Sequence, residues 1–147
     1  MCVKILISIY FFAILCLFAC SDELQCERHF IPHGYFGKVT IFFNQKNKER
    51  KLDKEGCRIY EIPGDGKYFT SFPYKEGSSI PNQTLRYFEI INKDSVKEIF
   101  QFEKNAFLQD TITNKNKKYV FFTASGYRNP GYFFEYYIDY GSNFRKY

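Results

Sequence analysis

The feature that most constrains the fold of this chain is a period of two in its apolar residues. The segment 38–44 shows it clearly, because Val39, Ile41 and Phe43 fall on one side of an extended backbone. Clusters of Gly, Pro, Asn and Ser separate it from further segments of this kind, at 58–62, 67–72, 85–92, 119–124 and 132–140. Short strands separated by turn signals predict a mostly β domain, built as a single sandwich rather than from alternating βα units.

Residues 95–107 depart from this pattern. Ser95 is a suitable helix cap, Glu98 follows three residues later, and apolar residues then recur at roughly helical spacing. We predict one short helix there, with a strand over 96–102 as the alternative. The run 44–56 is too polar to bury and is expected to form a long loop.

The first 19 residues have the layout of an export signal. Lys4 provides a charged start, a predominantly apolar run covers 5–19, and a small residue precedes Cys20. The apolar run has 15 residues, whereas about 20 are needed to cross a bilayer as a helix. A cleaved signal is therefore preferred over a permanent transmembrane anchor.

The sequence Leu17-Phe18-Ala19-Cys20 resembles the lipobox of bacterial lipoproteins, although Phe18 replaces the usual small residue. The resemblance implies that Cys20 is acylated, palmitate being a typical chain, and that the lipid anchors the protein in a membrane of the cell envelope. Residues 20–27 would then form a lipidated tether, and 28–147 the β domain. Ser21, Asp22 and Glu23 form an acidic start that resembles the surface-export signal of lipoproteins in the Bacteroidetes group, and this resemblance favours the outer membrane and its outside face.

Cysteine content and charge indicate the compartment of the protein and the kind of partner it binds. Once Cys20 carries lipid and the signal is removed, Cys26 and Cys57 remain. In an oxidising compartment they can form a disulfide; the alternative is that Cys26 sits in the tether and Cys57 is a buried thiol. The 21 basic and 16 acidic residues are interspersed, which argues against a nucleic-acid partner.

Two signatures in the first half of the domain resemble a known family. Residues 31–41 read IPHGYFGKVTI and residues 56–66 read GCRIYEIPGDG. They are similar to the IPxGYxGxVxI and GxRxYxIPxxG signatures of a family of exported bacterial domains of unknown function. A more distant resemblance to transthyretin-type and immunoglobulin-like sandwiches supports the predicted fold and implies no activity.

Catalytic or metal-binding constellations are weak in this sequence. His29 and His33 are the only histidines. A zinc site would need Cys26 and Asp22 as additional ligands, so we favour the interpretation that both histidines are ordinary surface residues. A catalytic role for Cys57 with a distant histidine is a further alternative, without supporting sequence signals. We predict no cofactor and no metal.

Carboxylate pairs offer a hydrolytic alternative. The local pairs are Glu61 with Asp65 and Glu135 with Asp139. The second pair shares one strand face with Tyr137, and that face is expected to be the solvent side of the sheet.

The C-terminal strand candidate suggests an interaction surface. Its even-numbered residues form an apolar face expected to lie in the core, so Phe133 and Tyr137 would be exposed on the other face. They could contact an envelope protein or a glycan. The leading hypothesis is a membrane-tethered, non-enzymatic accessory module. The rivals are an envelope hydrolase using a carboxylate pair and an immunity-type lipoprotein that blocks a toxin.

Overall fold

A computed structural model describes residues 26–74, 85–103 and 114–146. It contains one continuous sheet of nine strands in the order β3-β4-β1-β6-β7-β8-β9-β2-β5. The strands are β1 (Glu27–Ile31), β2 (Gly37–Phe42), β3 (Lys51–Leu52), β4 (Arg58–Glu61), β5 (Lys67–Phe69), β6 (Leu85–Asn92), β7 (Ser95–Gln101), β8 (Lys118–Arg128) and β9 (Gly131–Tyr140). A 3-10 helix, η1 (Gly141–Lys146), follows β9.

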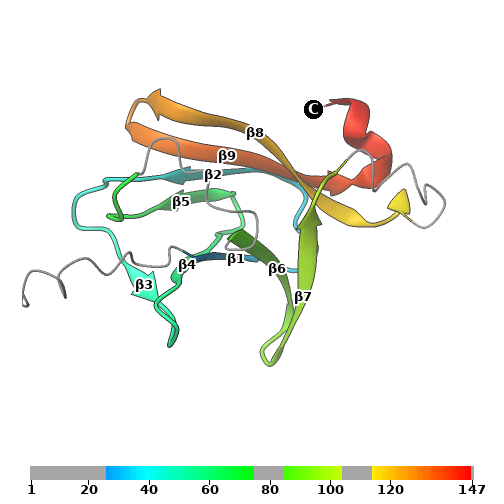
Figure 1. Cartoon of the computed structure of the whole chain (residues 1–147), viewed down its shortest axis with the longest axis horizontal. Coiled ribbons are helices and arrows are strands. Elements are labelled where there is room, and N and C mark those ends of the chain that lie inside the picture. The colour runs from blue at the N-terminus through cyan, green and yellow to red at the C-terminus, as the bar shows by residue number, and fades with distance from the viewer. Residues whose placement is uncertain (1–25, 75–84, 104–113, 147) are drawn as a thin grey trace, which may run out of the picture.

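The sheet is mixed and curls into a half-barrel, so that its two halves face each other (Figure 1). The lower half contains β4, β1, β6 and β7, and the upper half contains β8, β9, β2 and β5. β1 runs parallel to both β4 and β6, β2 runs parallel to β5, and a short parallel pairing of β7 with β8 joins the halves. The mostly β class is confirmed. The transthyretin- or immunoglobulin-like sandwich is not, because the two halves belong to one hydrogen-bonded sheet.

The core lies between the two halves and is formed by alternate residues of each strand. Buried aliphatic and aromatic side chains from β1, β2, β4, β6, β7, β8 and β9 make up its centre. Val39 and Ile41 of β2 are fully buried, as the period of two predicts. The core cluster consists of Ile31, Val39, Ile41, Phe43, Tyr60, Ile62, Phe72, Tyr87, Ile99, Val120, Tyr136 and Ile138.

The predicted helix over 95–107 is wrong, and the alternative strand over 96–102 is close to what the structure has. β7 begins at Ser95 and pairs antiparallel with β6 after a tight turn. Asn92 forms that turn, because its side-chain oxygen accepts a hydrogen bond from the backbone N–H of Asp94. Pairing with β6 satisfies one edge of the β7 backbone and buries Ile99. Tertiary pairing therefore outweighs the capping signal at Ser95.

Two other boundaries differ from the sequence prediction. The region between the predicted strands at 119–124 and 132–140, where a turn is expected, is mostly strand, since β8 continues to Arg128 and β9 begins at Gly131. The expected tether at 20–27 overlaps the domain, because Glu27 begins β1. Residues 20–25 of that tether, the signal at 1–19 and most of the region between the predicted strands at 67–72 and 85–92 lie outside the described residues. No helix in the described ranges is long and apolar enough to cross a bilayer.

Candidate functional site

A cluster of polar side chains lies in the centre of the fold. β1 turns Glu27 and His29 towards the core, on the same strand face as Ile31. The His29 side chain is completely buried, with its ring centroid 4.9 Å from those of Tyr60 and Tyr87. Its Nδ1 lies 3.0 Å from the hydroxyl oxygen of Tyr136 on β9. The cluster therefore connects both halves of the half-barrel.

Glu27 provides the negative charge of this cluster. Tyr60 donates a hydrogen bond of 3.1 Å to its carboxylate, and the Arg58 guanidinium lies 3.3 Å away. Burial alone would raise the pKa of Glu27, but His29, Arg58 and Tyr60 together lower it. Burial lowers the pKa of His29, because the Glu27 oxygen at 3.6 Å only partly offsets the loss of solvent. The cluster therefore combines an ionised carboxylate with a neutral imidazole.

This cluster is sealed from solvent, which bears on what it can do. His29 has no exposed surface, and its Nε2 has no hydrogen-bond partner in the described part of the chain. A general base must come within hydrogen-bond reach of its substrate. The arrangement therefore stabilises the fold in this conformation and offers no access for chemistry.

The predictions for the two histidines have different outcomes. The expectation that His29 lies on the surface is wrong, because the period of two in β1 puts a histidine in the core rather than an apolar residue. The side chain of His33 is 68% exposed and its Nδ1 lies 3.5 Å from Glu89. Cys26 forms a disulfide with Cys57, so neither sulfur is a free metal ligand or nucleophile.

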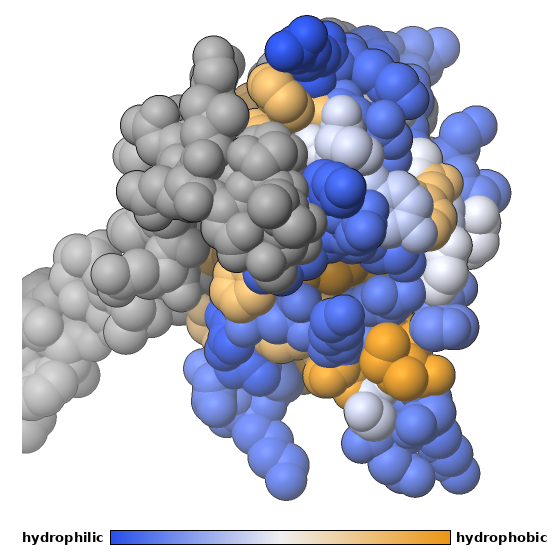
Figure 2. All heavy atoms as spheres, turned by 90° about the vertical axis from the view of Figure 1, so that its right-hand side faces the viewer, coloured by the Kyte–Doolittle hydropathy of each residue, from blue (hydrophilic) through white to orange (hydrophobic). Residues whose placement is uncertain are grey.

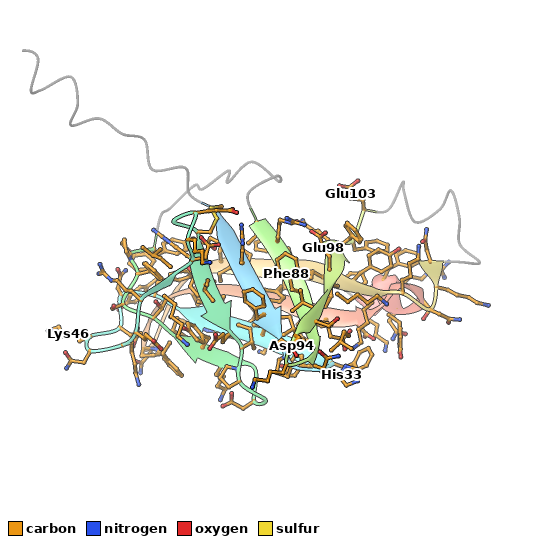
Figure 3. All side chains as sticks on the ribbon, turned by 90° about the horizontal axis from the view of Figure 1, so that it is seen from below. His33, Lys46, Phe88, Asp94, Glu98 and Glu103 are labelled. Atoms are coloured by element: carbon orange, nitrogen blue, oxygen red, sulfur yellow. A yellow bond between two sulfur atoms is a disulfide. The ribbon has the colours of Figure 1, made fainter. Side chains whose placement is uncertain are left out.

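A concave surface lies where β7 separates from β8. It is a cleft of about 910 Å³ lined by β6, β7 and residues at the start of β8. Five consecutive residues, 97–101, contribute to its wall. Their side chains alternate between the two faces of the sheet, so the cleft runs along the edge of β7. Figure 3 views this region from below, with Glu98 and Glu103 on the β7 side of the molecule and Phe88 on the neighbouring β6.

Fixed ion pairs neutralise most of the charge in the cleft. Arg86 binds Glu98 through two hydrogen bonds of 2.8 and 2.9 Å, and it lowers the pKa of that carboxyl. Lys118 lies 2.7 Å from Glu89. Burial works against ionisation of Glu89, yet Lys118 and the N–H of Gly34 hold its pKa below the ordinary value.

Two ammonium groups in the cleft remain unpaired. Lys97 and Lys117 make no side-chain ion pair or hydrogen bond within the described ranges. Phe100 lies in the same cleft and is 64% exposed. Sequence reasoning missed Lys97 and Phe100 because 95–107 was predicted to be a helix, and it gave no reason to place Lys117 beside them. The signal that could have identified Lys97 and Phe100 was the alternative strand over 96–102.

The predicted interaction surface on β9 needs correction. Phe133 is 8% exposed and therefore buried, although it lies on the expected face. The reason is the guanidinium of Arg128, which stacks 4.0 Å above its ring. Tyr137 is half-buried and has interaction partners of its own. The two rings therefore do not form an exposed aromatic surface.

The carboxylate pairs are engaged elsewhere. Glu61 pairs with Lys51 at 2.7 Å, and the side chain of Asp65 accepts a hydrogen bond from the backbone N–H of Lys67. The expectation that Glu135 faces solvent is wrong, because it is 8% exposed. Its carboxylate is held by neighbouring polar groups, namely Arg128 at 2.6 Å, Thr40 at 3.2 Å and Lys38 at 3.6 Å. Asp139 bonds to Asn143 at 2.8 Å.

A further acidic group lies beside the disulfide. Asp53, Glu55 and Cys57 bring potential ligand atoms within 4.8 Å of one another. Cys57 is oxidised, and Arg28 forms ion pairs with both carboxylates. Asp53 also accepts hydrogen bonds from the backbone N–H groups of Glu55 and Cys57. These contacts show that the acidic group stabilises the turn between β3 and β4.

Comparison with known proteins identifies a family, but that family has no assigned activity. A crystal structure described as "Putative Lipoprotein from Bacillus anthracis" is similar, with 19% identity over 79% of this chain and 70% of that chain and a TM-score of 0.49. None of the curated proteins matches the chain. The model of a family of unknown function, DUF6843, matches residues 25–128. The resemblance to a family of unknown function is therefore confirmed: the chain belongs to DUF6843.

Proposed function

We propose that the chain is exported as a lipoprotein, anchored to the cell envelope through lipid on Cys20, and that its β domain is a non-enzymatic interaction module. The observation that carries the proposal is the disulfide between Cys26 and Cys57. Such bonds persist in oxidising compartments and are rare in the cytosol. Cys26 follows Cys20 by only six positions, so the lipobox and the disulfide support the same route of export.

A binding role, rather than catalysis, is supported by the state of the reactive groups. The one buried histidine is sealed, and the carboxylates of the two predicted pairs are engaged in other bonds. The cleft beside β7, in contrast, leaves charged and aromatic groups accessible. Ligand sites are typically concave surfaces with a few polar groups of this kind.

Metabolic labelling with a fatty-acid analogue tests the anchor. The wild-type protein should be labelled and recovered with membranes, whereas Cys20→Ala should lose both properties. Cys16→Ala is a matched control, because it removes a cysteine from the predicted signal and should stay labelled. Equal labelling of the wild type and Cys20→Ala would contradict the anchor.

The acidic start at 21–23, with Asp22 and Glu23, motivates the more specific proposal of the outer membrane, facing outwards. Protease added to intact cells should then degrade the domain. Protection in intact cells, together with degradation after the outer membrane is opened, would contradict the outward orientation.

A further inference from the structure

The edge of β7 is the feature of this molecule that most resembles a vacant binding position. On one side β7 pairs with β6 from Ser95 to Ile99. On the other side only Phe100 and Gln101 pair with β8. Figure 1 shows this arrangement, with β7 at the right-hand side of the lower half and β8 passing its upper end. In the described ranges, the backbone of residues 95–99 has no strand beside it on that side.

This free edge borders the cleft. Unpaired backbone N–H and C=O groups on a strand edge form a template for an additional strand. The end strands of the sheet, β3 and β5, have only two and three residues. The unpaired part of β7 is longer and lies inside the sheet, between β6 and β8.

The charges around this edge indicate the charge of a suitable partner. With Arg86 paired to Glu98 and Lys118 to Glu89, the unpaired charged groups in the cleft are Lys97, Lys117 and Glu103, within the described part of the chain. Their sum is 2 − 1 = +1. Figure 2 shows a largely hydrophilic surface with apolar patches on this side of the molecule. The exposed Phe100 ring adds an apolar contact at the end of the free edge.

We propose that the cleft binds an extended acidic segment of another protein, which adds as a strand to the free edge of β7. Lys97 and Lys117 pair with its carboxylates, and Phe100 packs against an apolar side chain. The backbone hydrogen bonds provide affinity and the side-chain contacts provide specificity. This inference names the partner class for the interaction module proposed above, and therefore depends on that proposal.

The test uses the full chain in detergent micelles and two synthetic probes. One is a labelled peptide of alternating glutamate and valine, and the other is the same peptide with N-methyl groups on one edge of its backbone. We expect the first to bind, measured by fluorescence anisotropy, and the second to bind at least tenfold more weakly. Amide NMR shifts should change at residues 95–99. Equal binding of both peptides, or shift changes elsewhere, would overturn strand addition.

Charge variants test the partner's acidity. Lys97→Glu with Lys117→Glu should weaken binding by about tenfold, because two exposed charge pairs are reversed. Lys46→Glu with Lys48→Glu is the matched control, since Figure 3 shows Lys46 at the far end of the molecule. Equal weakening by both double variants would overturn the proposal, as would tighter binding of an alternating lysine–valine peptide or of an acidic oligosaccharide.

The outcome is separable from that of the proposed function. Failure of peptide binding with normal fatty-acid labelling would overturn the partner class alone. Loss of labelling with intact peptide binding would overturn the anchor alone.

Discussion

Replacement of the buried His29 by Gln should remove a pH dependence of stability. Burial lowers the pKa of His29 in the folded protein below its ordinary value of 6.5. The unfolded chain therefore binds a proton at a higher pH than the folded chain does. The stabilising contribution of neutral His29 is complete well above pH 6.5 and is lost as the pH falls towards the folded pKa.

The size of the effect follows from proton linkage. Between pH 7.5 and 5.5, an unfolded histidine of pKa 6.5 changes the free energy of unfolding by about 1.4 kcal/mol if the folded form stays neutral. The titratable groups near His29 are Glu27, Tyr60, Tyr87 and Tyr136. The pKa of Glu27 is lowered from 4.5 and those of the tyrosines are raised above 10, so none of them titrates in this interval.

Urea unfolding at several pH values measures this difference. The stability advantage of the wild type over His29→Gln should shrink by about 1.4 kcal/mol from pH 7.5 to 5.5. His33→Gln is the control for loss of a histidine as such and should lower the free energy of unfolding at pH 7.5 by less than His29→Gln does, because the His33 side chain is 68% exposed. An advantage that stays constant would show that His29 titrates alike in both states. An advantage that grows on acidification would show that it is charged in the folded protein.

Three further predictions address other parts of the fold. Gly66→Ala should lower the free energy of unfolding by more than about 1 kcal/mol, because Gly66 has φ +74° and an added Cβ would lie 2.3 Å from the carbonyl oxygen of Lys38. Gly64→Ala, where an added Cβ meets nothing within 4 Å, should have little effect in the same urea titration. Replacing both Cys26 and Cys57 by Ser should cost about 2–5 kcal/mol, and reductant should then lower the unfolding midpoint of the wild type only. Glu135→Gln should cost about 1–3 kcal/mol at pH 7. Burial opposes ionisation of Glu135, but its cationic neighbours hold its pKa below 4.5, so this wild-type advantage is present above pH 4.5 and is lost as the pH falls through the folded pKa.

The strands with strict alternation were predictable from the sequence, because one face of each packs into the core. β6 has the predicted bounds, and β2, β4 and β9 begin within one residue of the predicted starts. The strand β7 could not be predicted from the sequence, because pairing with β6 decides its conformation and no local signal reveals that partner. The curl of the sheet into a half-barrel could not be predicted from the sequence either, since it depends on the parallel pairing of β7 with β8 at only two residue pairs.

The candidate site was predicted less well than the fold. Phe133 was correctly placed on the outer face of β9, but Arg128, which covers its ring, comes from the neighbouring strand. The cleft depends on where β7 separates from β8, so its lysines could not be brought together by sequence spacing alone. The failed predictions are thus those that needed a partner from another strand.

His29 also explains how this sheet holds its register. In β1 the inward positions are Glu27, His29 and Ile31, and two of these three are polar. A shift of β1 by one residue would turn Arg28 and Phe30 inwards and expose the other set. Arg28 would then lose its ion pairs beside the disulfide, and Tyr136 would lose its partner across the core. Because a buried hydroxyl without a partner costs about 1–3 kcal/mol, the contact between His29 and Tyr136 favours the register in which the two halves of the sheet face each other.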